Sequence, residues 1–513
     1  MKMRMQSWPM GALQALAILA WMAVPARAEV RPHGLLADHM VIQRGLPVHV
    51  WGFADAGEKV SASFRGAQKS TQADALGQWS LYLPACEAGG PFSLEIKGTN
   101  TIRINDVLVG DVWVASGQSN MEFALRQAAN AEAEIAKADQ PRIRFFHVER
   151  TPADYPQLDV KARSWAPCSP EVARHASAVA YFFAREIQQK TGVPIGVVES
   201  YWGGTGAEAW TSLGTLAADA SLMPLFASRA RTAEREALGR LAIAKENADR
   251  ERAVLEAKAE GRPIPADTRP WHPDFASWAP AALYNGMIAP LTGFPIKGVI
   301  WYQGESNTAL DRVGVYDRLF PALIRDWRRA WGFGDFPFLF VQIANWQSGA
   351  GEDWPALRDA QRRTLSVANT AMVVTIDVGN PADIHPTNKQ DVGARLALAA
   401  RATVYGEHVE YAGPMFRQAY MEDGAMRVCF DHAASGLMAK DGVAKGGALT
   451  GFEVAGADRK FVPAKAEIDG TTLRVSSPQV PEPRFIRYGW ASSPECNLYN
   501  REGLPASPFQ SEE

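Results

Sequence analysis

The rhythm of hydrophobic and polar positions changes twice along the 513 residues of this chain. From about residue 30 to residue 105, short runs of alternating apolar and polar residues are separated by turns that contain glycine and proline. Such runs, without a helical period, predict a small β-sandwich. The strands we expect there span 39–43, 48–52, 59–64, 79–83 and 92–97.

The middle of the chain, from 106 to about 406, alternates apolar strand-like runs with longer helical stretches. This alternation predicts an α/β fold with a mostly parallel sheet and helices on both faces. In such sheets ligands bind at the carboxyl ends of the strands, so the chemistry is expected there. The expected strands are 111–115, 142–148, 195–200, 297–302, 336–343 and 371–377, and expected helices include 178–190, 316–331 and 355–368.

Two further stretches depart from this alternation. The segment from about 213 to 266 is rich in Ala, Glu, Arg, Lys and Leu and predicts an inserted helical pair. Its charges indicate solvated helix faces, although a lid or a subunit contact are alternatives. From 407 to 513 strand-like runs return, at 425–431, 471–476 and 484–490, and predict a second β region. We therefore divide the chain into 29–105, 106–406 and 407–513.

The first 28 residues have the features of a secretory signal. Lys2 and Arg4 precede an apolar run over 10–24, and the small residues Ala26 and Ala28 follow it. This order is typical of a signal peptide with an Ala-x-Ala cleavage site. An uncleaved membrane anchor is the alternative, but the run is short for a span. We expect a secreted or periplasmic protein without a membrane anchor after cleavage.

Charge and tryptophan content indicate which class of ligand the protein binds. The net charge is −3 and no run of Lys or Arg forms a basic stripe, which argues against nucleic-acid binding. The 16 tryptophans favour a carbohydrate ligand, because indole rings pack well against sugar rings. In an exported protein the cysteines could form up to two disulfides or remain four thiols. They are Cys86, Cys168, Cys429 and Cys496.

A serine stands directly after the first expected strand of the middle region. It is the centre of Gly117-Gln118-Ser119-Asn120-Met121, which ends that strand and begins a helix-like segment. The glycine allows a sharp turn, and the N–H groups at the start of the helix can face an oxyanion. Ser119 is therefore a candidate nucleophile, and a helix cap is the alternative. Because position 121 is Met, the Gly-x-Ser-x-Gly motif of α/β-hydrolases is absent.

Two other expected strands also end in chemically suggestive segments. Paired glycines in 201–206 allow backbone N–H groups to approach a ligand closely, although a plain strand-to-loop turn is the alternative. The segment 301–307 carries a run of polar side chains that includes Gln303. A side-chain amide at such a position can donate a hydrogen bond to a developing oxyanion.

The candidate base is His385, which follows the last expected strand of the middle region. Asp383 is near enough in sequence to fix its tautomer and to stabilise the imidazolium. The Asp431-His432 pair is an alternative, but it lies in the C-terminal β region, away from the strand ends that carry Ser119. Asp and His residues show no repeated ligand spacing, so we expect no metal and no cofactor.

These segments together resemble the SGNH hydrolases, and within them the sialate O-acetylesterase family of carbohydrate acetylesterases. The resemblance spans nearly the whole chain after residue 28, with the blocks in the same order. The matching blocks are 117–121, Trp202-Gly203-Gly204-Thr205, 283–288, 301–307, Asp383-Ile384-His385-Pro386, 496–500 and 503–509.

The resemblance implies a flavodoxin-like parallel sheet and ester hydrolysis by a serine nucleophile. Ser119 would attack the acetyl carbonyl, His385 would act as general base, and Asp383 would orient His385. The oxyanion would be bound by the N–H of Ser119, the N–H of a block glycine, for which we favour Gly204 over Gly203, and the amide of Gln303.

Two positions depart from the wider SGNH pattern. A single residue separates Asp383 from His385, where that pattern has Asp-x-x-His, so Asp377 or Glu305 could take the orienting role instead. Gln303 stands where the wider superfamily has asparagine, so its role in the oxyanion hole is an analogy.

The expected substrate is an acetylated sugar or oligosaccharide, most simply an O-acetylated sialic acid. Acetylated plant polysaccharide such as xylan or xyloglucan would suit the same chemistry. An ionised sialic acid calls for an arginine near the pocket, and the candidates are Arg126, Arg312 and Arg358. A non-catalytic carbohydrate-binding protein is the competing class.

Overall fold

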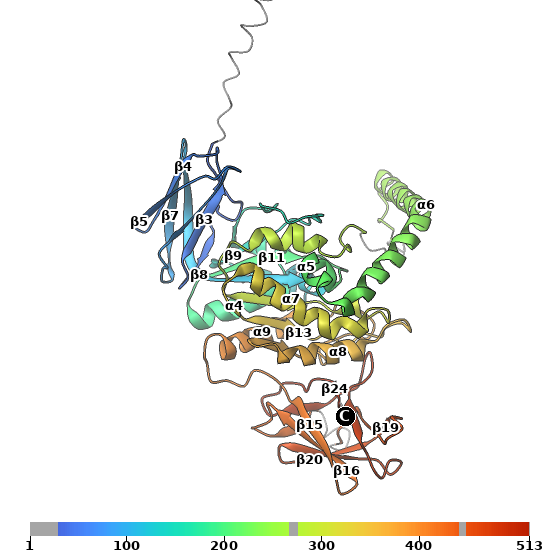
Figure 1. Ribbon diagram of the computed structural model, residues 1–513. Coiled ribbons are helices and arrows are strands. Elements are labelled where there is room, and N and C mark those ends of the chain that lie inside the picture. The colour runs from blue at the N-terminus through green and yellow to red at the C-terminus, as the bar shows by residue number, and fades with distance from the viewer. Residues whose placement is uncertain (1–28, 266–274, 441–447, 512–513) are drawn as a thin grey trace, which may run out of the picture.

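The computed structural model describes residues 29–265, 275–440 and 448–511, so the expected signal segment 1–28 lies outside the described residues. Figure 1 shows three regions in a row, with a β region in blue, a central α/β region, and a second β region in orange and red. The chain is thus a mixed α/β protein with a large central sheet. Within the described ranges, no helix has the length and apolar character needed to cross a membrane.

The N-terminal β region consists of two sheets. Residues of β3 and β4 alternate between buried and more exposed positions, as expected for strands with one face in a core. One strand, β5, was not expected, because its sequence is polar and neither face is buried. The first sheet contains β1 (Arg31–Pro32), β3 (Val48–Phe53) and β6 (Gln78–Leu83), and the second β2 (Val41–Gln43), β4 (Lys59–Phe64), β5 (Ala67–Gln72), β7 (Gly89–Lys97) and the start of β8 (Thr101–Gly117).

The long strand β8 joins the N-terminal region to the central sheet. Its first half pairs with β7 in antiparallel fashion, and its last residues pair in parallel with β11 and β12. The boundary expected between residues 105 and 106 therefore falls inside one continuous strand. This shared strand fixes the N-terminal β region to the sheet that carries the candidate chemistry.

The central sheet has the strand order β10-β9-β11-β8-β12-β13-β14. All neighbouring pairs are parallel except β10 with β9. Strands β11 and β12 are buried along their whole length, as is usual for parallel strands covered on both faces. The bounds are β9 (Gln140–His147), β10 (Ala166–Cys168), β11 (Ile195–Tyr201), β12 (Gly298–Tyr302), β13 (Phe338–Val341) and β14 (Thr370–Val373).

Helices cover both faces of this sheet. Trp113 and Ala115 of β8 belong to one buried cluster with α4 (Ala178–Thr191) and α9 (Lys389–Thr403). Val112 and Val114, which point to the other face, belong to a second cluster with α7 (Tyr316–Trp331) and α8 (Trp354–Arg363). Short helices α1 (Ser119–Glu122), α2 (Ala131–Ile135) and α3 (Pro170–His175) follow strand ends or connect strands.

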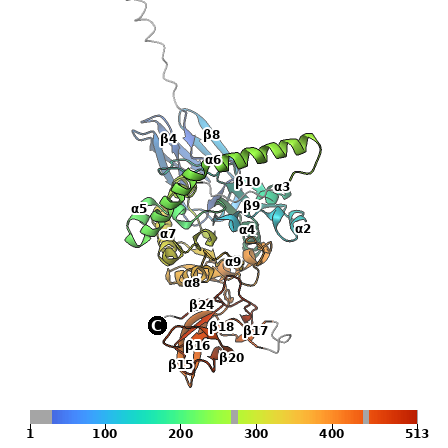
Figure 2. The same ribbon diagram turned by 90° about the vertical axis from the view of Figure 1, so that its right-hand side faces the viewer.

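The insertion differs from the helical pair that the sequence predicted. A short helix α5 (Leu213–Ala217) is followed by a single helix α6 (Met223–Ala259) of 37 residues. Gly239 is accommodated inside α6, and the chain turns only after it, where Gly261 adopts a φ of 64°. A single interior glycine is not enough to end a helix, so this segment forms one long helix in place of the expected pair. In Figures 1 and 2, α6 extends away from the central region.

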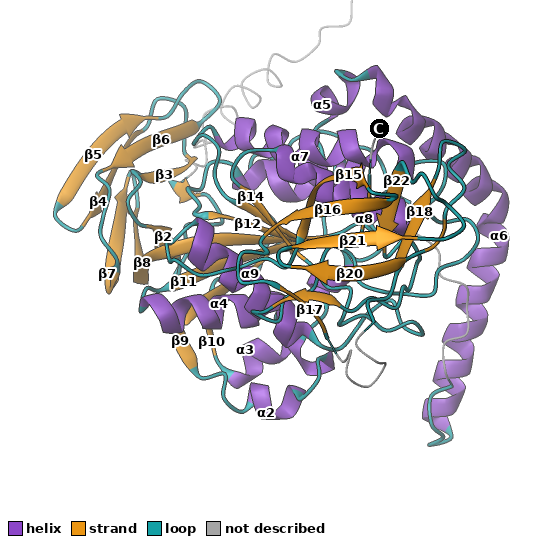
Figure 3. Cartoon of the chain, turned by 90° about the horizontal axis from the view of Figure 1, so that it is seen from below, coloured by secondary structure: helices purple, strands orange, loops and turns teal. Residues whose placement is uncertain are grey.

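The C-terminal β region has its own core, which includes Val428, Leu473, Ile486 and Phe509. Figure 3 shows its strands β16, β21 and β20 side by side. One sheet contains β15 (Met415–Glu422), β16 (Ala425–Asp431), β20 (Lys465–Asp469) and β21 (Thr472–Ser476), a second β18 (Phe452–Ala455), β19 (Val462–Pro463), β22 (Phe485–Tyr488) and β24 (Phe509–Gln510), and a third β17 (Leu437–Ala439) and β23 (Leu498–Asn500).

All four cysteines are free thiols, so neither of the disulfides that an exported protein could have formed is present. Cys168 and Cys429 are buried, and the other two are partly buried. The fold is therefore held by its cores and hydrogen bonds.

Candidate active site

The central strands β11, β8 and β12 end at the same level. Gly117, the last residue of β8, pairs with Tyr201 of β11 and with Tyr302 of β12. It adopts a φ of 134°, and a Cβ atom there would lie 2.1 Å from the carbonyl oxygen of Tyr302. Only glycine fits this turn. The three segments that follow these strands, 118–122, 202–206 and 303–307, therefore meet at one edge of the sheet.

Ser119 and His385 lie in hydrogen-bond contact at this edge. The Oγ atom of Ser119, the first residue of α1, is 2.8 Å from Nε2 of His385, which lies between β14 and α9. Burial, and then the charge of Lys389, lower the pKa of His385, while Asp383 and Glu122 oppose this shift. The imidazole is consequently neutral at neutral pH and can accept the serine proton.

Of the three carboxylates considered as partners of His385, Asp383 is the one that faces its Nδ1 atom. The distance from Asp383 Oδ1 to His385 Nδ1 is 3.7 Å, and the Asp383 side chain is 54% exposed. Asp377 is bound by both terminal nitrogens of Arg395, at 2.7 Å each. Glu305 is buried and accepts a 2.6 Å hydrogen bond from Asn120. Asp377 and Glu305 are thus engaged away from the imidazole.

Two backbone N–H groups near Ser119 are available to a ligand. Within the described part of the chain, the N–H groups of Ser119 and Gly204 donate to no protein acceptor. The N–H of Gly203, by contrast, donates a 2.6 Å hydrogen bond to Glu122. A Cβ atom at Gly203 would lie 3.2 Å from Cβ of Ser119, so this loop contacts the serine directly. Of the two glycines considered for the oxyanion hole, Gly204 is thus the one whose N–H has no protein acceptor among the described residues.

Gln303 does not have the geometry that we expected of an oxyanion donor. Its Nε2 atom donates to the carbonyl oxygen of Thr205 at 3.2 Å and to Oδ1 of Asn307 at 2.7 Å, so both amide hydrogens are used. Its Oε1 atom accepts from Tyr316, and the side chain is fully buried. Asn307 in turn accepts from the N–H of Ala207. Gln303 therefore holds the 205–207 loop through these hydrogen bonds, and its amide has no hydrogen left to donate to an oxyanion.

Three residues at this edge were not expected to have a role. Glu122 binds the N–H of Gly203 and pairs with Arg150. Asn120 and Lys389 form a hydrogen bond of 2.5 Å in the buried layer under Ser119. Asn120 and Lys389 stand close in sequence to Ser119 and His385, and this proximity is the signal that could have found them. Glu122, three residues after Ser119, carries the same signal.

The arginines considered for a charged substrate have other partners. Arg126 contacts His175 at 2.9 Å, and Arg312 lies 3.6 Å from Glu208. Arg358 is fully buried and donates to the carbonyl oxygens of residues 343, 344, 491 and 492, which fastens the C-terminal region to the central one. Arg150, by contrast, is linked to the segment that follows Ser119, because it pairs with Glu122 and lies over the ring of Trp202 at 5.4 Å.

The alternative histidine, His432, lies in the C-terminal β region. Its Nδ1 atom is 2.7 Å from Oε1 of Glu410, and its backbone oxygen accepts from Asn500. These contacts belong to the packing of that region. The described ranges hold no group of three His, Cys, Asp or Glu side chains that could bind a metal ion.

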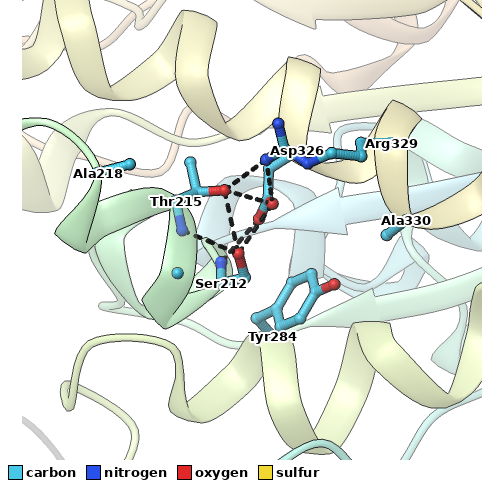
Figure 4. A pocket seen from close by; sticks show the side chains of 8 residues that line it. Ser212, Thr215, Ala218, Tyr284, Asp326, Arg329 and Ala330 are labelled. Carbon is cyan, nitrogen blue, oxygen red and sulfur yellow. Dashed lines mark hydrogen bonds and ion pairs between the residues drawn. The ribbon is translucent and has the colours of Figure 1, made fainter.

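A hollow of about 470 Å³ elsewhere in the central region does not include these residues. Figure 4 shows that Asp326 points at Ser212 and Thr215 within it, with hydrogen bonds of 2.7 Å to the Ser212 N–H and 2.5 Å to the Thr215 hydroxyl. Arg329 completes the cluster, with a contact of 3.0 Å to Asp326. These groups satisfy one another and attach α5 to α7, so the hollow has a structural explanation.

Comparison with known proteins identifies a family of esterases. A family profile described as carbohydrate esterase, sialic acid-specific acetylesterase, matches residues 269–402. A sialate O-acetylesterase from Rattus norvegicus is 30% identical and covers 98% of this chain and 97% of its own length. Another from Mus musculus is 29% identical, with 96% of both chains covered.

A solved structure is also similar. The crystal structure of a carbohydrate acetylesterase from Xanthomonas citri has a TM-score of 0.79 to this chain and is 40% identical, covering 94% of this chain and 99% of that one. Since such similarity extends over nearly the full length of these relatives, the chain belongs to the sialate O-acetylesterase family of carbohydrate esterases.

Proposed function

We propose that this protein hydrolyses O-acetyl esters of carbohydrates with Ser119 as nucleophile and His385 as general base. The observation that carries the proposal is the 2.8 Å contact between Ser119 Oγ and His385 Nε2 at the carboxyl edge of a parallel sheet. A serine and a base within hydrogen-bond distance are the minimum that nucleophilic ester hydrolysis requires.

The reaction follows from this geometry. As Ser119 Oγ attacks the acetyl carbonyl, its proton passes to Nε2 of His385. The oxyanion that forms is bound by the N–H groups of Ser119 and Gly204, and one such donor typically lowers the barrier by about 3 kcal/mol. His385 then protonates the departing sugar oxygen and leaves an acetyl ester on Ser119. Water attacks this ester with His385 again as base, and acetate is released.

The strand order supports the finer assignment to an SGNH-type, flavodoxin-like sheet. If β9 and β10 are set aside as added strands, the strands β11-β8-β12-β13-β14 follow the order 2-1-3-4-5. In that order the ligand site lies where neighbouring connections diverge, between the first and third strands. These are β8 and β12, and Ser119 directly follows β8.

The most direct substrate is an O-acetylated sialic acid, because the rat and mouse relatives carry that name. One observation favours the second candidate, a neutral acetylated polysaccharide such as xylan or xyloglucan. Arg150, which is linked to the Ser119 segment through Glu122, is already paired with that carboxylate. A sialate carboxylate would have to compete with Glu122 for it, whereas a neutral sugar would not.

Acetate release by the purified protein tests both levels of the proposal. O-acetylated sialic acid and acetylated xyloglucan oligosaccharides are compared, with Ser119→Ala as control. Release that disappears in the variant supports the serine mechanism, and the ratio of the two rates identifies the substrate class. If neither these nor a simple aryl acetate releases acetate, the protein is better described as a carbohydrate-binding protein.

The N-terminal segment supports a secreted or periplasmic location, in which residues 1–28 are removed. Mass spectrometry of the exported protein provides the test. A mature chain that begins at Glu29 is expected, and retention of residues 1–28 would contradict the proposal.

A further inference from the structure

A lysine without a carboxylate partner lies in the buried layer beneath the candidate nucleophile. Lys389 is the first residue of α9 and is fully buried. Within the described ranges no carboxylate oxygen lies within 4.0 Å of its Nζ atom, which instead donates a 2.5 Å hydrogen bond to Oδ1 of Asn120. Burial of an ammonium group without an ion pair is costly, so such a residue calls for a functional explanation.

The partner of this lysine connects the two halves of the site. Asn120 directly follows Ser119, and its Nδ2 atom donates to the carbonyl oxygen of Ile384 at 3.0 Å. Ile384 directly precedes His385. The same nitrogen donates to Oε1 of Glu305 at 2.6 Å. Asn120 thus ties the serine turn to the histidine loop, and Lys389 holds the oxygen of its amide so that the nitrogen points at both acceptors.

Two aromatic rings lie against the ammonium group of Lys389. Lys389 Nζ is 4.7 Å from the ring centre of Phe123 and 5.5 Å from that of Tyr302. Phe123 is in turn stacked against the His385 ring, with 6.3 Å between centres. The ring faces partly compensate the buried charge. Phe123 contacts both Lys389 and the base, and a charge that acts across an apolar ring is screened less than one that acts through water.

The charged groups around His385 have opposite effects. Lys389 lowers the pKa of His385, and Asp383 and Glu122 raise it. The pKa of Lys389 itself is lowered to about 7 by burial, against the opposing charges of Glu305 and Asp383. Burial raises the pKa of Glu305, while Asn120 and Lys389 favour its ionised form. Below pH 7 the lysine therefore carries its proton while His385 titrates.

We propose that Lys389 is a positioning residue of the esterase reaction: through Asn120 it fixes Ser119 relative to His385, and its charge holds the imidazole in the neutral form that accepts the serine proton. This inference rests on the serine mechanism proposed above. It assigns a task to a residue that touches neither the substrate nor the reacting atoms.

Three variants separate positioning from charge. Lys389→Met removes the charge and the hydrogen bond, so kcat is expected to fall about 100-fold with KM changed less than about threefold. The acid limb of kcat/KM is expected to move to higher pH by about half a unit or more. Asn120→Ala keeps the charge but breaks the link, so kcat should fall while the acid limb stays in place. Lys389→Arg, which keeps the charge, should keep the limb near its wild-type position.

A matched control is available at the opposite edge of the sheet. Lys297 precedes β12, is partly buried, and lies over the ring of Tyr405 at 5.5 Å. Lys297→Met removes a lysine at the amino end of β12, away from the carboxyl ends of the strands, and neither kcat nor the acid limb should change. Thermal unfolding of all variants shows whether they are folded. Lys389→Met should not be destabilised, because methionine fills the space without a buried charge.

NMR titration of His385 gives an answer that does not depend on turnover. With histidine labelled at the Cε1 carbon and the signal assigned by His385→Gln, the pKa of His385 should rise by about half a unit or more in Lys389→Met. An unchanged His385 pKa in Lys389→Met would overturn the inference. So would a loss of kcat in a variant that is partly unfolded at the assay temperature, because the loss would then reflect instability. A wild-type protein that releases no acetate would instead refute the proposed function, while the titration still reports whether Lys389 acts on the base.

Discussion

The Oδ1 atom of Asp383 lies 3.7 Å from Nδ1 of His385 and accepts a 2.8 Å hydrogen bond from the backbone N–H of the same histidine. The short spacing of the two residues explains this arrangement, because an aspartate readily binds a backbone N–H two residues further along the chain. The carboxylate therefore stabilises the loop first and the imidazole second. Its effect on His385 is mainly that of a nearby, solvated charge.

This relationship predicts a mild phenotype for Asp383→Asn. Asparagine retains an oxygen for the backbone N–H, and only the charge is lost, so kcat should fall by about tenfold or less. Because Asp383 raises the pKa of His385, its removal should move the acid limb of kcat/KM to lower pH. Steady-state kinetics with an aryl acetate between pH 4 and 8 measure both effects.

The control for this variant is His385→Gln, which removes the base and should reduce kcat at least about a thousandfold. If Asp383→Asn were as inactive as His385→Gln, the carboxylate would have to move into direct contact with Nδ1 during the reaction, contrary to the geometry described above.

The pH dependence of the wild-type protein follows from the same histidine. Burial and Lys389 lower its pKa below the ordinary value of 6.5, so the imidazole stays neutral to lower pH than a solvated one. The base form is needed, so kcat/KM should still be above half its maximum at pH 6.5 and should decline at lower pH, with a limiting slope of about tenfold per unit. An uncharged acetyl ester avoids titration of the substrate. A half-maximal point above pH 6.5 would contradict this prediction.

The sequence was most informative for candidate catalytic residues that directly follow predicted strands. Ser119, Gly204 and His385 follow strands whose apolar runs are easily recognised, and parallel strands bring their carboxyl ends to one edge. Helix α7 has the predicted bounds of 316–331, because its apolar positions recur with a helical period and Gly332 ends it. Strand β5 was missed since neither of its faces is buried, and hydrophobic alternation is absent without a buried face.

Side-chain hydrogen bonds could not be predicted in the same way. The sequence marks Gln303 as a polar residue at a strand end. Its two amide hydrogens are donated to Thr205 and Asn307, and only the folded chain shows that these two acceptors lie beside it. Lys389 looks like an ordinary charged residue at the start of a helix. Its burial depends on α9 packing over the serine turn, which is a tertiary property.

Glu122 offers a test of how the loop beside Ser119 is held. Its Oε2 atom accepts the N–H of Gly203, and its other oxygen pairs with Arg150. Glu122→Ala removes both contacts, so the Gly203–Gly204 loop loses its restraint and kcat should fall about 10- to 100-fold. Glu122→Gln keeps an oxygen for Gly203, and its kcat should stay within about fivefold of wild type.

The Glu122 pair is informative because the two variants differ in one contact. Both lose the negative charge that raises the pKa of His385, so both should shift the acid limb to lower pH. Only the alanine variant should lose kcat strongly. Equal kcat values for the two variants would mean that the Gly203 hydrogen bond does not contribute to the reaction.

The turn at Gly117 should be the least tolerant position of the site. An added Cβ would lie 2.1 Å from the carbonyl oxygen of Tyr302, which β12 holds in place, and φ is 134°. Neither the backbone clash nor the strained dihedral can be relieved by moving a flexible side chain, so Gly117→Ala should lower the free energy of unfolding by more than about 3 kcal/mol. Gly314→Ala is the matched control, because nothing lies within 4 Å of its Cβ position and its φ is not positive. Denaturant unfolding followed by circular dichroism measures both. A Gly117→Ala protein as stable as Gly314→Ala would show that β8 can end in another conformation, and the placement of Ser119 at the sheet edge would then no longer depend on this glycine.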